Sequence, residues 1–199
     1  MKKHKIRASY SFLHEWSKGN IKQALLGYFH VPHPTPTNYV NGKRWDTYAT
    51  EYIEKHSKLP PEWGGTSFNV PVCQLKTLMP YNALSTITGV YDIYDKETQI
   101  ITELKSGHSY SARQYSTTMQ IPLYLLIAEL AKIPVKRVDI LRYNPKTDMC
   151  DRAIVVPNQR VIRKAKNYLD TWIPEVYQYF DTMGLFTKTE QEMAQLLAS

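Results

Sequence analysis

Apolar positions along the chain recur with two periods, which predict helices towards both ends and strands in the middle. Spacings of three and four residues predict helices over 9–28, 41–55, 112–131, 158–180 and 188–197. Runs rich in β-branched and aromatic residues predict strands over 68–75, 84–94, 99–105, 136–143 and 153–156. Gly19 and Asn20 are expected to break the first helix, and Pro122 to kink the helix that contains it or mark its start.

This order of elements indicates a mixed α/β protein with a central β-sheet flanked by α-helices. A length of 199 residues suits one compact domain. Within it we expect N-terminal helices and a Pro-rich loop over 1–66, the main sheet and a helix over 67–156, and C-terminal helices over 157–199.

The polar tetrapeptide 95–98 separates two predicted strands and predicts an antiparallel hairpin. Because side chains alternate along a strand, Glu103 and Lys105 project from one face, with Cα atoms about 6.6 Å apart. Closing the hairpin places Glu103 opposite residues 90–92, so Asp92 lies within one or two rungs of it. Asp95 is expected only to form the turn.

Two carboxylates and a lysine that converge in a sheet suit a hard divalent cation such as Mg²⁺, which takes oxygen ligands. The lysine can offset charge that develops on phosphorus during phosphate chemistry. The alternative for Glu103 and Lys105 is an ion pair exposed to water at a sheet edge, which contributes little.

The hairpin motifs resemble the PD-(D/E)XK nuclease superfamily, which has a restriction-endonuclease-like core. They are Gly89-x-x-Asp92 on one strand and Glu103-x-Lys105 on the next. The RecB-like exonuclease branch, which includes CRISPR-associated relatives, also has Gln-x-x-x-Tyr on the following helix and often a serine-rich start to its first helix. Similar segments here are Gln120-x-x-x-Tyr124 and Ser9-Tyr10-Ser11, and the motifs follow the family order over most of the chain.

The resemblance implies hydrolysis of DNA phosphodiester bonds, exonucleolytic or at single-stranded or flap-like ends. It implies Mg²⁺ or Mn²⁺ held by Asp92, Glu103 and the carbonyl of Leu104. Lys105 would assist the attack of water, and the helix motif would line the site. The residues implied to be catalytic are therefore Asp92, Glu103, Lys105, Gln120 and Tyr124.

Two departures from the family pattern concern metals. Where the branch often has Gly-x-x-x-His on the second helix, this chain has Gly42-x-x-x-Asp46. Asp46 could ligate Mg²⁺ or Mn²⁺, or it could be an exposed aspartate in a diverged helix. The chain has only Cys73 and Cys150, so the four-cysteine iron–sulphur cluster of some relatives is not expected.

A formal net charge of +7 permits a polyanionic partner. We expect one polar face of the 112–131 helix and a basic cluster early in the 158–180 helix to meet DNA, with a solvated helix face as the alternative for each. His108 is a further candidate for substrate contact, with an ordinary surface histidine as the favoured alternative. The residues expected to bind nucleic acid are Arg113, Gln120, Tyr124, Arg160, Arg163 and Lys164.

No apolar run long enough for a signal peptide or a membrane span is present, so we expect a cytoplasmic protein without a membrane partner. No P-loop motif is present, so any helicase would be a separate subunit. The change at Asp46 motivates a second hypothesis, a non-catalytic nucleic-acid- or protein-binding module on a nuclease fold. A third is an α/β protein whose hairpin has only a surface ion pair.

Overall fold

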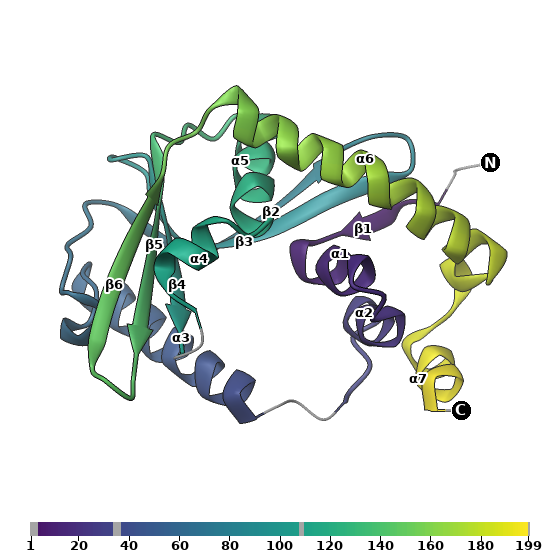
Figure 1. Ribbon diagram of the computed structural model, residues 1–199, viewed down its shortest axis with the longest axis horizontal. Coiled ribbons are helices and arrows are strands. Elements are labelled where there is room, and N and C mark those ends of the chain that lie inside the picture. The colour runs from purple at the N-terminus through teal and green to yellow at the C-terminus, as the bar shows by residue number, and fades with distance from the viewer. Residues whose placement is uncertain (1–3, 34–36, 108–109, 199) are drawn as a thin grey trace.

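The computed structural model describes residues 4–33, 37–107 and 110–198. Within these ranges six strands form a mixed sheet, with helices on both sides of it (Figure 1). The strands are β1 Ile6–Ala8, β2 Pro71–Pro80, β3 Ser85–Asp95, β4 Ile100–Ser106, β5 Arg137–Asn144 and β6 Met149–Val155. The helices are α1 Tyr10–Ser17, α2 Ile21–Tyr28, α3 Thr37–His56, α4 Ala112–Ser116, α5 Gln120–Leu130, α6 Gln159–Thr182 and α7 Glu190–Ala198, with short 3₁₀ turns at Pro61–Trp63 and Leu185–Thr187.

The sheet divides along one edge of β3. The strand order is β1-β3-β4-β5-β6, and β2 pairs with the other edge of β3. On the divided edge, β1 pairs in parallel with residues 85–87 and β4 pairs antiparallel with residues 93–95. Residues 88–92 lie between these two ladders, so side chains can reach the backbone of β3 there.

Two apolar cores cover the two faces of the sheet. The larger lies under α1, α2, α5 and α6 and includes Ile101, Leu126 and Leu169. The smaller lies between the sheet and α3 and includes Ile53 and Leu104. Among the described helices, none is both long and apolar enough to cross a membrane.

The predicted hairpin is confirmed, since Ile93 of β3 pairs with Thr102 of β4. The predicted break in the first helix is also confirmed, with α1 ending at Ser17 and α2 beginning at Ile21. The prediction missed β1, which has three residues and is too short to show a period of its own. It is held instead by pairing with β3.

A continuous helix over 112–131 is wrong. The α-helical hydrogen bonding is interrupted over residues 117–119, where Thr117 and Thr118 bond to the third residue back, so α4 and α5 are separate helices. Ser111 and Gln114 form a capping box that begins α4. Pro122 lies in the first turn of α5, where a missing N–H removes no helical hydrogen bond.

Asp95 forms the turn, as predicted. Its carboxylate accepts hydrogen bonds from the backbone N–H groups of Glu97 and Thr98 in the turn, and of Asn69 and Val70 before β2. The side chain therefore fastens the hairpin to the start of the neighbouring strand.

Candidate active site

Asp92 lies where the ladder between β3 and β4 ends. The register that pairs Ile93 with Thr102 places Asp92 opposite Glu103. Instead of a backbone carbonyl, the Oδ2 atom of Asp92 accepts the Leu104 N–H, at 2.8 Å. Burial raises the pKa of Asp92, although Lys105 and the Leu104 amide oppose the rise. The predicted approach of Asp92 to Glu103 is therefore confirmed.

Glu103 is the most enclosed carboxylate of the site, with a side chain 1% exposed. Its Oε1 atom accepts hydrogen bonds from Lys105 Nζ at 2.5 Å and Gln120 Nε2 at 2.6 Å. Its Oε2 atom is buried and has no hydrogen-bond partner within the described part of the chain. Burial and the charge of Asp92 raise the pKa of Glu103 to about 8, against the effect of Lys105. A carboxylate in this setting is not the water-exposed ion pair of the alternative interpretation.

Lys105 is a positive charge held among these carboxylates. Burial by itself would lower its pKa, but Glu103 and Asp92 outweigh that effect and raise it. Its Nζ atom lies 5.8 Å from the centre of the Tyr115 ring, within the range of a cation–π contact. Lys105 is therefore protonated near neutral pH.

Side chains of helix α5 bridge β3 and β4, which diverge beyond this point. Gln120 and Tyr124 lie one turn apart on the same helical face. Gln120 Nε2 also donates to the Tyr124 hydroxyl at 2.8 Å, and that hydroxyl donates to the Val90 carbonyl at 2.6 Å. Burial and the charges of Glu103 and Asp92 raise the pKa of Tyr124 well above its usual value, so this donor remains protonated.

Gly89 permits the close approach of α5 to β3. A Cβ atom at this position would lie 3.0 Å from Ile127 Cδ1 and 3.4 Å from the Tyr124 ring. Any side chain here would push against the face of α5 that presents Tyr124.

Asp46 reaches the site from α3. It is half-buried, and its Oδ1 atom is buried without a hydrogen-bond partner in the described ranges. Burial and the charge of Asp92 raise its pKa to about 6, while Lys105 opposes the rise. The alternative of an exposed aspartate is therefore wrong. Gly42, one turn earlier, lies against the end of β4, where its carbonyl accepts the Ser106 hydroxyl at 3.5 Å.

The carboxylates do not form a ready-made metal cage. Across residues 4–33, 37–107 and 110–198, no group of three or more His, Cys, Asp and Glu side chains is arranged to hold a metal ion. A cation at this site would need backbone or water oxygens as well.

The other predicted contacts lie outside this cluster. Arg113 is exposed on α4. The prediction that it shares a helical face with Gln120 is wrong, because α4 and α5 are separate helices. His108 lies outside the described residues. The basic residues Arg160, Arg163 and Lys164 are exposed early in α6.

The start of α6 lies at the opposite end of the sheet from the site. Val155, the last residue of β6, pairs with Val138 near the start of β5. Lys105 pairs with Arg142 near the end of β5. In Figure 1 the start of α6 is accordingly at the top, while β4 runs down towards α3.

Three residues near the site were not predicted. They are Tyr115, under the Lys105 ammonium; Gln74, whose Nε2 atom is 3.5 Å from Asp92 Oδ1; and Arg142, beside Lys105 in the β4–β5 register. Arg142 donates to Asp151 at 2.6 Å and to the Gly107 carbonyl at 3.2 Å. The parallel register between β4 and β5, if known in advance, would have placed Arg142 beside Lys105. Local sequence patterns do not encode that register.

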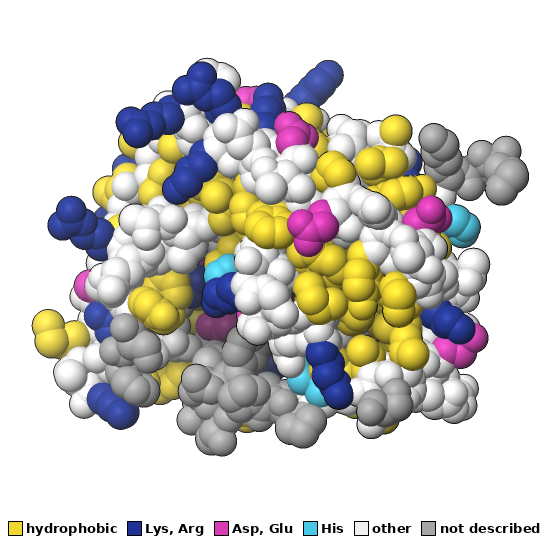
Figure 2. Space-filling view, turned by 45° about the vertical axis from the view of Figure 1, so that its right-hand side comes forward, with side chains coloured by type: hydrophobic (Ala, Val, Ile, Leu, Met, Phe, Trp, Pro, Cys, Tyr) yellow, Lys and Arg dark blue, Asp and Glu magenta, His cyan; other side chains and the backbone are white. Residues whose placement is uncertain are grey.

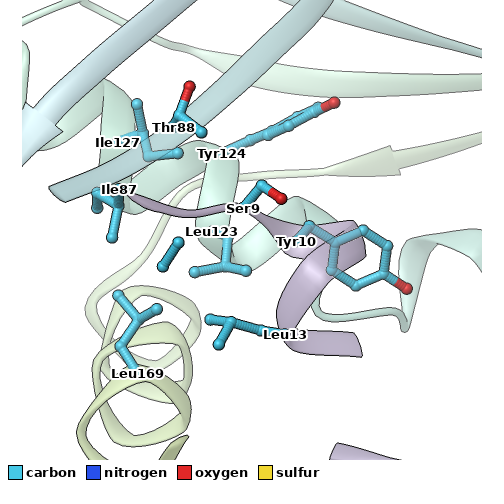
Figure 3. A pocket seen from close by; sticks show the side chains of 10 residues that line it. Ser9, Tyr10, Leu13, Ile87, Thr88, Leu123, Tyr124, Ile127 and Leu169 are labelled. Carbon is cyan, nitrogen blue, oxygen red and sulfur yellow. The ribbon is translucent and has the colours of Figure 1, made fainter. Parts of the chain in front are cut away.

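A small cavity adjoins the site without being part of it (Figure 3). Its volume of about 10 Å³ suits a single water molecule. Ile87, Leu123, Ile127 and Leu169 line it, with Tyr124 at its edge. It is too small and too apolar for a nucleotide.

Comparison with known proteins gives the fold. No protein-family model and no curated protein matches the sequence. A phage related exonuclease from Haemophilus somnus 129PT has a similar structure, with a TM-score of 0.54, 13% identity, and coverage of 91% of this chain and 97% of that one. SSO0001 has a TM-score of 0.54 at 12% identity, covering 85% of this chain and 78% of that one.

An alkaline exonuclease from Laribacter hongkongensis, LHK-Exo, was solved in complex with dAMP. That structure has a TM-score of 0.51 at 11% identity, covering 90% of this chain and 93% of that one. The mixed central sheet flanked by helices thus matches exonuclease structures of restriction-endonuclease-like fold, which confirms the predicted fold class.

Proposed function

We propose that the protein is a metal-dependent DNA nuclease that hydrolyses phosphodiester bonds as an exonuclease or at single-stranded or flap-like ends. The observation that carries this proposal is Glu103, a buried carboxylate beside Asp92 with one oxygen held by Lys105 and Gln120 and the other without a partner among the described residues. The fold is shared with exonucleases, and the complex of LHK-Exo with dAMP favours DNA as the substrate class.

Mg²⁺ or Mn²⁺ would be held by Asp92, Glu103 and the Leu104 carbonyl, with Asp46 in place of the family histidine. Unpartnered buried oxygens on Glu103 and Asp46 fit a cation, since an unmet buried carboxylate oxygen is costly. Mg²⁺ usually binds a few protein oxygen atoms, and water molecules complete its coordination shell. When bound, the cation would supply Lewis-acid activation and charge neutralisation.

The chain's own residues then have separate tasks in hydrolysis, in which water adds to phosphorus and a P–O bond breaks. The Lys105 ammonium, which donates to Glu103, would stabilise negative charge on the phosphate. Gln120 holds the orientation of Glu103, and Tyr124 ties α5 to β3.

DNA would approach across Arg113 and extend to the basic residues at the start of α6. Arg160, Arg163 and Lys164 lie at the far end of the sheet, so they would contact the backbone away from the bond that is cut. Figure 2 shows Lys and Arg side chains projecting around the upper left of one face of the molecule. Such contacts give affinity without sequence preference.

The test is cleavage of end-labelled linear single- and double-stranded DNA, a flap substrate and circular single-stranded DNA, each with Mg²⁺, Mn²⁺ or EDTA. We expect metal-dependent cleavage of the linear and flap substrates only. Asp92→Asn, Glu103→Gln and Lys105→Met should each lower the rate by about 100-fold or more. Glu97→Gln, an exposed change in the same hairpin, is the matched control.

Tight DNA binding without cleavage in any metal would contradict the proposal and favour a non-catalytic binding module. Equal rates for Glu103→Gln and Glu97→Gln would mean that the activity comes from elsewhere.

A further inference from the structure

Gln74 interrupts β2 directly opposite Asp92. The ladder between β2 and β3 pairs Cys73 with Ile93 and Leu75 with Tyr91, and the rung between these pairs is missing. Gln74 has a φ of +51°, in the left-handed region. A residue other than glycine, asparagine or aspartate is uncommon there and persists only where the surrounding structure holds it.

Both strands change faces at this rung. Cys73 packs against the smaller core, whereas Leu75 packs against the larger one on the other side of the sheet. Ile93 and Tyr91 differ in the same way on β3. Residues two apart in a regular strand share a face, so the alternation is reversed between them.

The residue at which β3 changes faces is Asp92, between Tyr91 and Ile93. Its carboxylate accepts the Leu104 N–H, and the register places it opposite Glu103. Tyr91 faces α5, where its ring lies 5.0 Å from that of Tyr124 and its hydroxyl donates to the Tyr124 carbonyl at 3.1 Å. In a regular strand Tyr91 and Ile93 would share one face, so the backbone at Asp92 and the direction of its carboxylate would differ.

We propose that Gln74 is a positioning residue, and that its left-handed backbone sets where the Asp92 carboxylate lies relative to Glu103 and the Leu104 amide. Its side chain is exposed, so core packing does not account for its conformation. The amide contact to Asp92, at 3.5 Å, is long and secondary. The consequence for catalysis rests on the proposed nuclease function, whereas the consequence for the geometry of Asp92 does not.

The kinetic test compares residues that accept a left-handed backbone with residues that resist it. Gln74→Gly and Gln74→Asn should keep kcat within about threefold of the wild type, because both accept positive φ. Gln74→Val should lower kcat by about 10- to 100-fold with little change in KM, because it displaces Asp92, a proposed metal ligand, rather than the DNA-binding surface. Gln74→Ala should fall between them and serves if the valine variant does not fold. Lys76→Val, exposed on the same strand, is the control.

A second measurement needs neither metal nor DNA. The Leu104 amide donates to Asp92, so its hydrogen exchange, followed by NMR, reports where that carboxylate lies. Gln74→Val should raise its exchange rate by about 10-fold or more, while Gln74→Gly leaves it unchanged.

Equal behaviour of the glycine and valine variants in the exchange measurement would overturn the proposal. An equal loss of kcat in both would assign the effect to the side chain and overturn it as well. If the wild type cleaves no DNA but Leu104 exchange follows the expected order, the nuclease proposal fails and the positioning role of Gln74 stands.

Discussion

Asp92 accepts the Leu104 amide hydrogen at 2.8 Å, at the point where backbone pairing between β3 and β4 stops. A side chain thus replaces a strand carbonyl, and the two strands diverge beyond it. The buried carboxylate of Glu103 lies where β3 and β4 diverge. Gln120 and Tyr124 of α5 cover this gap. The candidate site is therefore a consequence of the division in the sheet.

Gln120 is expected to matter through Glu103. Gln120→Ala removes one of the two hydrogen bonds to Glu103 Oε1 and the contact with Tyr124. Loss of a residue that orients a metal ligand typically costs about 10- to 100-fold in activity or metal affinity, and we expect a loss of that size. Cleavage kinetics and Mn²⁺ titration measure it, with the exposed Gln191→Ala as control. Unchanged kinetics in Gln120→Ala would show that Lys105 alone orients Glu103.

Gly89 is expected to resist enlargement. Gly89→Val places methyl groups where even a Cβ atom would lie 3.0 Å from Ile127, so it should destabilise the protein by about 1–3 kcal/mol. Urea unfolding measures the loss, and cleavage should fall with it because Tyr124 is displaced.

Gly27→Ala is the matched control for Gly89, because among the described residues no atom beyond its chain neighbours and its own helix backbone lies within 4 Å of the added Cβ. Alanine is also the better helix former, so this variant should be neutral or more stable. A Gly89→Val protein as stable as Gly27→Ala would mean that α5 can move away freely.

Asp95 is expected to make stability depend on pH. Burial by itself would raise its pKa, but hydrogen bonds from Asn69, Val70, Glu97 and Thr98 outweigh this and lower it. The ionised Asp95 therefore stabilises the fold at pH values above its unfolded-state pKa of about 3.9. This stabilisation is lost as the pH falls through the folded-state pKa.

Asp95→Asn should accordingly cost about 1.5–3 kcal/mol at neutral pH, and this cost should shrink as the pH falls through the lowered folded pKa of Asp95. Urea unfolding of both proteins across this pH range measures the difference. A cost that does not change as the wild-type carboxyl becomes protonated would rule out the ionised carboxylate as its source. Asp181→Asn, exposed on α6, should change stability by no more than about 0.5 kcal/mol.

The basic start of α6 is expected to show itself in the salt dependence of DNA binding. Replacing Arg160, Arg163 and Lys164 together with glutamine should weaken binding. Each lost phosphate contact lowers the slope of log K against log salt by about 0.9 on duplex DNA. Fluorescence anisotropy in EDTA measures this without cleavage.

The control is a second triple variant that removes three positive charges elsewhere on the surface. In it, glutamine replaces the exposed residues Lys18, Lys22 and Lys146. If both triple variants reduce the slope of log K against log salt by the same amount, DNA affinity depends on net charge and the start of α6 is not a contact surface.

Local sequence determined the hairpin and the helix motif. Asp92 and Glu103 are joined by one short turn, so strand alternation and turn chemistry suffice to bring them together. The same holds for Gln120 and Tyr124, which lie one turn apart on a helix. The order of helices and strands, read from the same local periods, made the α/β fold class predictable.

The tertiary structure decided what depends on contacts between distant elements. The division of the sheet at β3 needs β1 to pair with residues 85–87, far along the chain. The burial of Asp46 depends on where α3 lies relative to the sheet. No local period encodes these features, because each is held by a neighbour that only folding brings into place.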